Sequence, residues 1–93
     1  MSFYTVKPTK KFQRDLKLAK KRGYDISLLT EIIKLLANDE PLPEKYRDHY
    51  LTGDFAGCRE CHITPDWLLV YEKDAQNLFL YLMRTGSHSD LFK

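Results

Sequence analysis

Apolar and polar positions along this chain repeat with two different periods, and the first of these is helical. Phe12, Leu16 and Ala19 stand three or four residues apart, which is the spacing of one face of an α-helix. The pattern predicts a helix over residues 10–22, with the Thr9 hydroxyl as its N-terminal cap.

A second helix is expected directly after the first, because leucine and isoleucine fill one broad face of the next stretch. It should begin at Asp25 or Ser27 and end near Asn38, after Gly23 has ended the first helix. A helix with so wide an apolar face is expected to pack across the core.

The second period is two, and it predicts β-strands. In the stretch 59–64, Cys61 and Ile63 should face one side of a strand. Glu60 and His62 should then face the other side. Further strands are expected at residues 3–6, 67–72 and 78–84, with a short strand near 50–51 inside an otherwise irregular loop over 39–57.

These elements predict a single α+β domain over residues 1–93, in the order β-α-α-β-β-β. The short turns between the last strands favour antiparallel hairpins. Both helices are expected on one face of a mainly antiparallel sheet. The other face is expected to be open, and His62 should lie on it.

Basic residues gather in the first expected helix, although the whole chain carries a formal net charge of only +2. Such a stripe attracts polyanions such as RNA, or an acidic protein. The alternative is an ordinary solvated helix face. The residues concerned are Lys10, Lys11, Arg14, Lys17, Lys20, Lys21 and Arg22.

The sequence gives no sign of a membrane span or of an apolar signal region at the amino terminus. We therefore expect a cytoplasmic protein with no membrane partner. Cys58 and Cys61 form a C-x-x-C pair, but residues three apart in a strand face opposite sides. They are interpreted as packed thiols. The histidines lack metal-ligand spacing, so no metal and no cofactor is expected.

The three histidines, His49, His62 and His88, lie beside polar groups near the ends of expected elements. Imidazole can take and give a proton near neutral pH, since its ordinary pKa is about 6.5. Arg84 ends an apolar strand, a rim position from which its planar guanidinium suits a phosphate. Asp66 lies in a nearby turn. Proton transfer beside an anion, in a small basic protein, points to RNA cleavage.

Several short motifs occur in a fixed order along almost the whole chain. The most specific closes it, Arg84-Thr85-Gly86-Ser87-His88-Ser89-x-Leu91-Phe92. The earlier ones are the basic run 17–22, Pro41-Leu42-Pro43, Asp48-His49, Leu51-x-Gly53, Arg59, His62, Pro65-Asp66-Trp67 and Val70-Tyr71. With these motifs the chain resembles the YafQ-like branch of the RelE-type bacterial toxins.

The resemblance implies a RelE-like fold and the toxin of a type II toxin–antitoxin pair, an mRNA endonuclease that acts on the ribosome. The implied partners are a cognate antitoxin, mRNA in the ribosomal A site and ribosomal RNA, which the basic helix would hold. Operon DNA would be bound only through the antitoxin complex. The implied catalytic residues are His49, His62, Asp66, Arg84 and His88, and the implied substrate-binding residues are Phe92 and Trp67.

The expected chemistry uses the RNA's own 2′-hydroxyl as nucleophile and leaves a 2′,3′-cyclic phosphate and a 5′-hydroxyl, with no metal. Arg84 is expected to clamp the scissile phosphate. His88 is expected to be the general acid, with either His49 or His62 as the base. Asp66 either orients an imidazole or accepts the proton itself.

Two points stay open at the level of sequence. Phe92 is expected to stack on a base, whereas Trp67 either touches RNA or supports the site from the core. The alternative to an enzyme is a non-catalytic module that binds RNA, or binds the antitoxin in repressing their operon.

Overall fold

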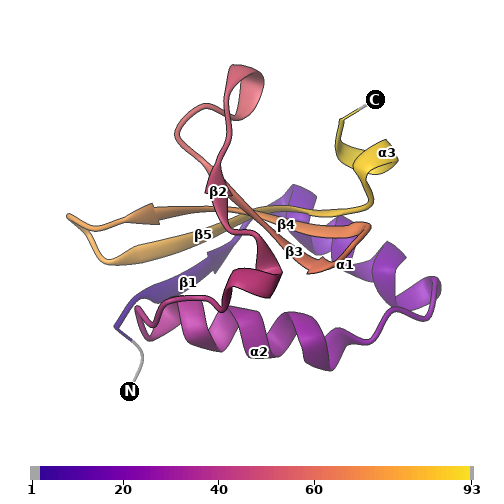
Figure 1. Ribbon diagram of the computed structural model, residues 1–93, viewed down its shortest axis with the longest axis horizontal. Helices are drawn as coiled ribbons and strands as arrows, with labels where there is room; N and C mark the ends of the chain where they lie inside the picture. The colour runs from indigo at the N-terminus through magenta and orange to yellow at the C-terminus, as the bar shows by residue number, and fades with distance from the viewer. Residues whose placement is uncertain (1–2, 93) are drawn as a thin grey trace.

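The computed structural model of the protein describes residues 3–92 and consists of one mixed sheet with helices beside it (Figure 1). The strands are β1 (Thr5–Pro8), β2 (His49–Tyr50), β3 (Arg59–Thr64), β4 (Trp67–Asp74) and β5 (Phe79–Gly86). The helices are α1 (Lys10–Lys21), α2 (Ile26–Ala37) and the short α3 (His88–Leu91), with 3-10 turns η1 (Glu44–Tyr46) and η2 (Gly53–Phe55). Among these residues no helix has the length and apolarity needed to cross a membrane.

The sheet has five strands in the order β1-β5-β4-β3-β2. β1 runs parallel to β5, and every other neighbouring pair is antiparallel. The predicted α+β class and the mainly antiparallel sheet are therefore confirmed. The short strand expected in the long loop is also present, as β2, one residue earlier than predicted.

Each long helix begins at the kind of side-chain cap that the sequence predicted. Thr9 Oγ1 accepts a hydrogen bond from the Phe12 amide at 3.1 Å, and Asp25 accepts one from the Ser27 amide at 3.1 Å. Gly23 follows α1 with a φ of +78°, a left-handed conformation that glycine adopts at little cost. The turn between the helices is thus specified locally.

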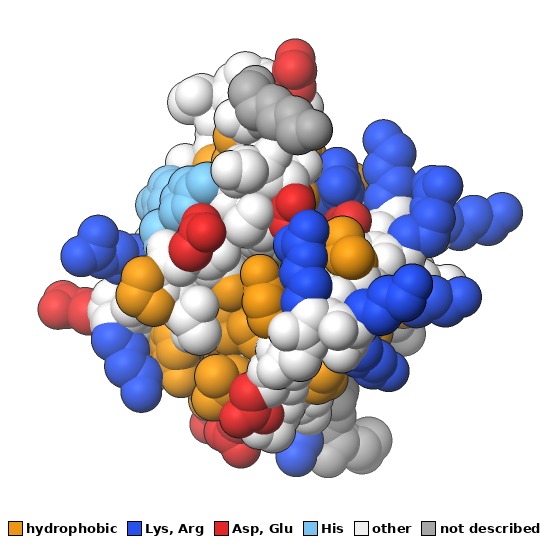
Figure 2. Space-filling view, turned by 90° about the vertical axis from the view of Figure 1, so that its right-hand side faces the viewer, with side chains coloured by type: hydrophobic (Ala, Val, Ile, Leu, Met, Phe, Trp, Pro, Cys, Tyr) orange, Lys and Arg blue, Asp and Glu red, His pale blue; other side chains and the backbone are white. Residues whose placement is uncertain are grey.

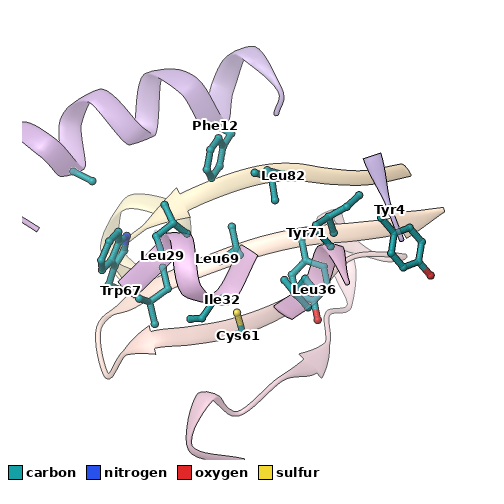
Figure 3. Close-up of a cluster of buried hydrophobic side chains, with 14 residues drawn as sticks. Tyr4, Phe12, Leu29, Ile32, Leu36, Cys61, Trp67, Leu69, Tyr71 and Leu82 are labelled. Carbon is teal, nitrogen blue, oxygen red and sulfur yellow. The ribbon is translucent and has the colours of Figure 1, made fainter. Parts of the chain in front are cut away.

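One face of the sheet carries the main hydrophobic core, and both long helices cover it (Figure 3). This confirms the predicted two helices on one face. The buried side chains that meet there include Phe12 and Ala19 from α1, Leu29, Ile32 and Leu36 from α2, and Cys61, Ile63, Leu69, Tyr71, Leu80 and Leu82 from the strands. Cys58 and Cys61 are both buried free thiols, as expected.

The opposite face of the sheet is partly covered, so the expectation that it would be open was wrong. Leu68 and Val70, which alternate with the core residues of β4, are both 0% exposed. α3 and the segment around η2 rise on this side of the sheet, away from α2 (Figure 1). Strand alternation predicted which residues face this side, but it does not report a loop that folds over them.

The first strand lies two residues later than predicted. Tyr4 is buried, and its amide donates to the Ala37 carbonyl at 2.7 Å, which ties the chain to the end of α2 before β1 begins. Pro8 is the last residue of the strand, opposite Leu82. β1 is an edge strand, where proline is tolerated because one side of the strand needs no ladder donor.

We predict that two neighbouring leucines of α2 differ sharply in their contribution to stability. Leu29 is 2% exposed and Leu28 is 41% exposed. Leu29→Ala should lower the free energy of unfolding by about 2–5 kcal/mol, because it leaves a cavity in the core. Leu28→Ala should lower it by less than about 1 kcal/mol. Urea unfolding followed by circular dichroism measures both, and equal losses would contradict this account of the core.

Candidate active site

The three histidines lie in a row on the sheet face opposite the main core. The ring centroids of His49 and His62 are 6.1 Å apart, and those of His62 and His88 are 5.6 Å apart. They come from β2, β3 and the first position of α3. Figure 2 shows the imidazoles as a single group on the surface. The fold thus assembles side chains that are well separated along the sequence.

A buried carboxylate joins two of the histidines. Glu60 Oε1 lies 3.4 Å from His49 Nε2 and 3.5 Å from His62 Nε2, and Glu60 is only 4% exposed. A buried carboxylate requires such polar partners. His49 Nδ1 lies 2.7 Å from the Arg47 carbonyl oxygen. Because a carbonyl only accepts, Nδ1 carries the hydrogen and Nε2 is the nitrogen that faces Glu60.

His88 has a carboxylate partner of its own. Asp66 Oδ1 lies 2.7 Å from His88 Nδ1 and also accepts a hydrogen bond from the His88 backbone amide at 3.1 Å. The imidazole hydrogen bond, with the backbone bond second, holds the pKa of the Asp66 carboxyl below its ordinary value. The His88 side chain is 51% exposed, so its Nε2 remains free to exchange a proton.

The short helix α3 holds His88 in place through a capping box. Ser87 Oγ accepts from the Asp90 amide, and the Asp90 carboxylate accepts from the Ser87 amide at 2.9 Å. Arg22, directly after α1, donates to Asp90 at 2.7 Å. These bonds, led by that from Arg22, hold the pKa of the Asp90 carboxyl well below its ordinary value. The tail of the chain, residues 87–92, is therefore held through Asp90 both to Arg22 and to Ser87 at its start.

A pocket of about 640 Å³ opens beside the row of histidines. His62 and His88 line it, together with the end of β3, the start of α2 and the loop that contains η1. The other lining residues are Leu28, Lys45, Tyr46, Arg47, Ile63, Thr64 and Pro65. A strand of RNA could enter here and meet two imidazoles on one wall.

Arg84 lies apart from this pocket, at the edge of the sheet beside α1. Its Nε donates to Asp15 at 2.6 Å and its Nη2 to the same carboxylate at 3.1 Å. The Thr85 amide also donates to Asp15, at 3.2 Å. β1 pairs with β5 only as far as Leu82. Beyond that point the Asp15 carboxylate accepts the hydrogen bond of the Thr85 amide, which has no partner in β1. Direct contact with a phosphate in the pocket would require Arg84 to exchange this partner.

Trp67 is buried, which corrects its assignment to substrate binding. It is 3% exposed, and its Nε1 donates to Thr85 Oγ1 at 2.9 Å. Thr85 Oγ1 in turn donates to the Leu68 carbonyl at 2.7 Å. The indole also packs on the Tyr24 ring, with centroids 4.9 Å apart. Trp67 thus supports the strands around the site and presents no free face to RNA.

Phe92 remains available for stacking, since it is 41% exposed. Its ring meets Phe55 of η2 edge to face, with centroids 5.5 Å apart. The two rings line a smaller pocket of about 280 Å³ together with Thr52, Asp54 and Leu91. An aromatic pair of this kind offers an apolar surface for a base.

The short strand β2 is held beside β3 by a second cluster. Asp48 accepts hydrogen bonds from Arg59 Nη2 at 3.0 Å and from the Tyr71 hydroxyl at 2.5 Å. The Arg59 guanidinium also lies over the Tyr50 ring, 4.1 Å from its centroid. Burial, and then the bond to Asp48, raise the pKa of Tyr71. These contacts fix the residue before His49 and so set where that imidazole lies.

His49, Glu60 and His62 are also the residues that could hold a metal ion. Their ligand atoms all lie within 4.8 Å of one another. Tetrahedral zinc with bonds of roughly 2.0–2.1 Å separates neighbouring ligand atoms by about 3.4 Å, close to the two spacings around Glu60. No such site was expected from the sequence, because the histidines are far apart along the chain.

Comparison with known proteins fits this geometry. A family model described as the bacterial toxin of a type II toxin–antitoxin system, YafQ, matches residues 4–93. The chain belongs to the YafQ toxin family. The mRNA interferase toxin YafQ of Escherichia coli K12 is 42% identical over 82 residues, 87% of each chain.

Solved structures of bacterial toxins share the fold. The E. coli DinJ-YafQ toxin-antitoxin complex has a chain with a TM-score of 0.89 and 37% identity, covering 98% of this chain and 99% of that one. A metal-bound toxin from Helicobacter pylori has a TM-score of 0.90 and 47% identity, covering 96% and 99%. The predicted family and fold are therefore confirmed.

The basic residues assigned to RNA binding in this YafQ family member are all exposed. In Figure 2 most of the Lys and Arg side chains gather on one side, and the histidines lie on the other. Arg22 differs from the rest because it is paired with Asp90. The exposed set on and directly after α1 is Lys10, Lys11, Arg14, Lys17, Lys20, Lys21 and Arg22.

Three residues of this YafQ site were missed at the level of sequence. Alternation placed Glu60 on the same strand face as His62, but its position between His62 and His49 was not predicted. Asp15 is the one acid within the basic stripe, which was the available signal for a structural partner. Phe55 had no local signal, because only the tertiary fold brings η2 beside the tail.

We predict that the pKa of Asp66 depends on His88. In a ¹³C NMR titration of the carboxyl groups, Asp66 should titrate below the ordinary value of about 3.9, and His88→Ala should raise it. The pKa of Asp74 is also lowered, by Asn77, which His88 does not touch. Asp74 should therefore keep its low pKa in the variant.

The lowered pKa of Asp66 also determines how the stability of the protein changes with pH. A carboxyl whose pKa is lower in the folded state than in the unfolded state stabilises the fold at pH values above its unfolded-state pKa. That contribution is lost as the pH falls through its folded-state pKa. The difference in stability between the protein and His88→Ala should therefore shrink below about pH 4. An unchanged Asp66 pKa in the variant would refute the assignment.

Proposed function

We propose that this protein is the toxin of a type II toxin–antitoxin pair and that it cleaves mRNA by metal-independent acid–base chemistry. The proposal rests chiefly on one observation. His62 and His88 line the same pocket with ring centroids 5.6 Å apart, and each is held by a carboxylate. The E. coli relative named mRNA interferase toxin YafQ supports the same activity.

The reaction needs only two proton transfers around a phosphodiester. A base removes the proton of the 2′-hydroxyl, and the 2′-oxygen forms a bond to the adjacent phosphorus. The bond from phosphorus to the 5′-oxygen breaks, and an acid gives that oxygen a proton. The products are a 2′,3′-cyclic phosphate and a 5′-hydroxyl, and no further reactant is required.

We assign the acid to His88 and the base to His62. Asp66 holds His88 through Nδ1, which leaves Nε2 as the nitrogen that can donate a proton to the leaving oxygen. His62 is preferred to His49 as the base because it lines the pocket and His49 does not. Glu60 binds both imidazoles and keeps His62 oriented toward the pocket.

Two further assignments concern the substrate. Phe92, with Phe55 beside it, would stack on a base of the strand and hold it in line for attack. Arg84 would stabilise charge on the phosphorane after leaving Asp15, since its guanidinium is bonded there in the free protein. Asp15 therefore acts as a positioning residue for Arg84.

The partners follow from the charges and from the relatives. The exposed basic residues of α1 would contact ribosomal RNA, so that mRNA in the ribosomal A site reaches the pocket. An antitoxin is proposed because the E. coli relative is found in a DinJ-YafQ toxin-antitoxin complex. Operon DNA would be bound only through that complex. An acidic antitoxin segment would suit the basic surface by charge complementarity.

We predict that His88→Ala strongly slows mRNA cleavage. Mapping of 5′ ends on a reporter mRNA in a reconstituted translation system should show new 5′-hydroxyl ends with the unaltered protein only when ribosomes are present. His88→Ala should lower the cleavage rate by about 10²–10⁴-fold, as expected on losing a general acid. Intact mRNA with a folded, unaltered protein would favour a non-catalytic binding module instead.

The matched control is Ser89→Ala, in the same turn of α3. Ser89 is exposed and has no part in the proposed chemistry, so this variant should cleave at the unaltered rate. Both variants should keep the circular dichroism spectrum of the protein. Equal losses in the two variants would indicate damage to α3 in place of a loss of proton transfer.

We also predict that the other two histidines differ in their effect. His62→Gln should lower the cleavage rate by about 10²-fold or more, as expected for the base. His49→Gln should cost less, because it removes a neighbour of Glu60 and no group of the pocket. Single-turnover rates on programmed ribosomes measure both. A larger loss with His49→Gln would reverse the assignment of the base.

A further inference from the structure

The pocket beside the histidines has two basic residues that the basic helix does not supply. Lys45 lies in η1, and Arg47 directly follows it. Both line the pocket together with His62 and His88. The short loop over residues 44–47 therefore brings two basic side chains to the same pocket as His62 and His88.

Both side chains carry free positive charge. Lys45 and Arg47 are exposed, and none of the ion pairs among residues 3–92 includes either of them. The Lys45 ammonium lies 5.0 Å from the centroid of the neighbouring Tyr46 ring. An aromatic face does not neutralise the ammonium, which keeps charge and N–H donors for an anion.

Other arginines near the site are already bonded to carboxylates. Arg84 is bonded to Asp15, Arg22 to Asp90, and Arg59 to Asp48. Arg84 and Arg22 line a separate cavity beside α1 with their carboxylate partners. Among the described residues that line the pocket of the histidines, the cationic groups free of a carboxylate are those of Lys45 and Arg47.

The loop is held in register with the row of histidines. Arg47 has a φ of +50°, an uncommon conformation for a residue other than glycine. In this conformation its amide donates to the Glu44 carbonyl at 2.9 Å, and its own carbonyl accepts from His49 Nδ1. The backbone that presents the Arg47 side chain is thus bonded directly to the site.

We infer that Lys45 and Arg47 form a phosphate-binding subsite for the RNA strand, next to the phosphate that is cut. The inference rests on the proposed function and names the part of the site that grips the substrate backbone. The ligand is a phosphodiester of single-stranded RNA adjoining the scissile one. Contacts to phosphate place the strand without reading its bases, so this subsite adds affinity and no sequence preference.

The test uses an RNA that binds and cannot be cut. A fluorescein-labelled, fully 2′-O-methylated single-stranded oligonucleotide lacks the attacking hydroxyl, so fluorescence anisotropy reports binding alone. Lys45→Gln combined with Arg47→Gln removes both charges, leaves a polar side chain at each position and keeps the Arg47 carbonyl. We expect the dissociation constant to rise about tenfold at low salt. The salt slope of the logarithm of affinity should fall by about 1.4, roughly 0.7 for each phosphate that is no longer neutralised.

The control removes the same charge elsewhere. Lys7→Gln combined with Lys34→Gln alters two exposed residues that do not line the pocket, and it should bind and cleave as the unaltered protein does. An affinity and a salt slope equal to those of this control would overturn the subsite. So would a failure of the unaltered protein to bind the probe at low salt.

The proposed function is judged separately, by cleavage of unmodified mRNA on ribosomes. If the unaltered protein cleaves mRNA there and the two double variants bind the probe equally well, the nuclease activity is supported and the subsite is refuted. Binding that depends on Lys45 and Arg47, with no cleavage by the unaltered protein, would keep the subsite and remove the nuclease.

Discussion

The arrangement of the site depends on the register of the central strand β4. Leu68 pairs with His62 on one side and with Gly86 on the other. One residue of the buried strand therefore fixes the distance between the β3 histidine and the start of the tail. Leu68 is 0% exposed, and a slip by one residue would turn it and its neighbours to the wrong face. Asp66, in the turn just before β4, is then beside His88.

Much of this fold follows from local patterns. Helical spacing, the Thr9 and Asp25 caps and strand alternation each specify an element without reference to the rest of the chain. The family motifs then supplied the candidate site residues, of which His49, His62, Asp66 and His88 lie close together in the fold. Glu60 and Asp15 were missed because their roles depend on partners across the fold. Trp67 was assigned to the substrate because its position in a motif does not report that its ring is buried.

Charged groups in this protein divide into two populations with different physical consequences. Arg22, Arg59 and Arg84 are bonded to carboxylates that lie far from them in the sequence, and these bonds hold the tail, β2 and the sheet edge. The exposed lysines of α1 and of η1 form no ion pair with a carboxylate among the described residues. The first population sets the shape of the site, and the second leaves it positively charged toward a polyanion.

The burial of Trp67 also makes the molecule convenient to study. It is the sole tryptophan of the chain, and it packs against Tyr24, in the turn between the two long helices, while its Nε1 is bonded to Thr85 of β5. Indole emission shifts to the red when the ring meets water. The intrinsic fluorescence of the protein is therefore a built-in reporter of whether the strands around the histidines are assembled, without any label near the pocket.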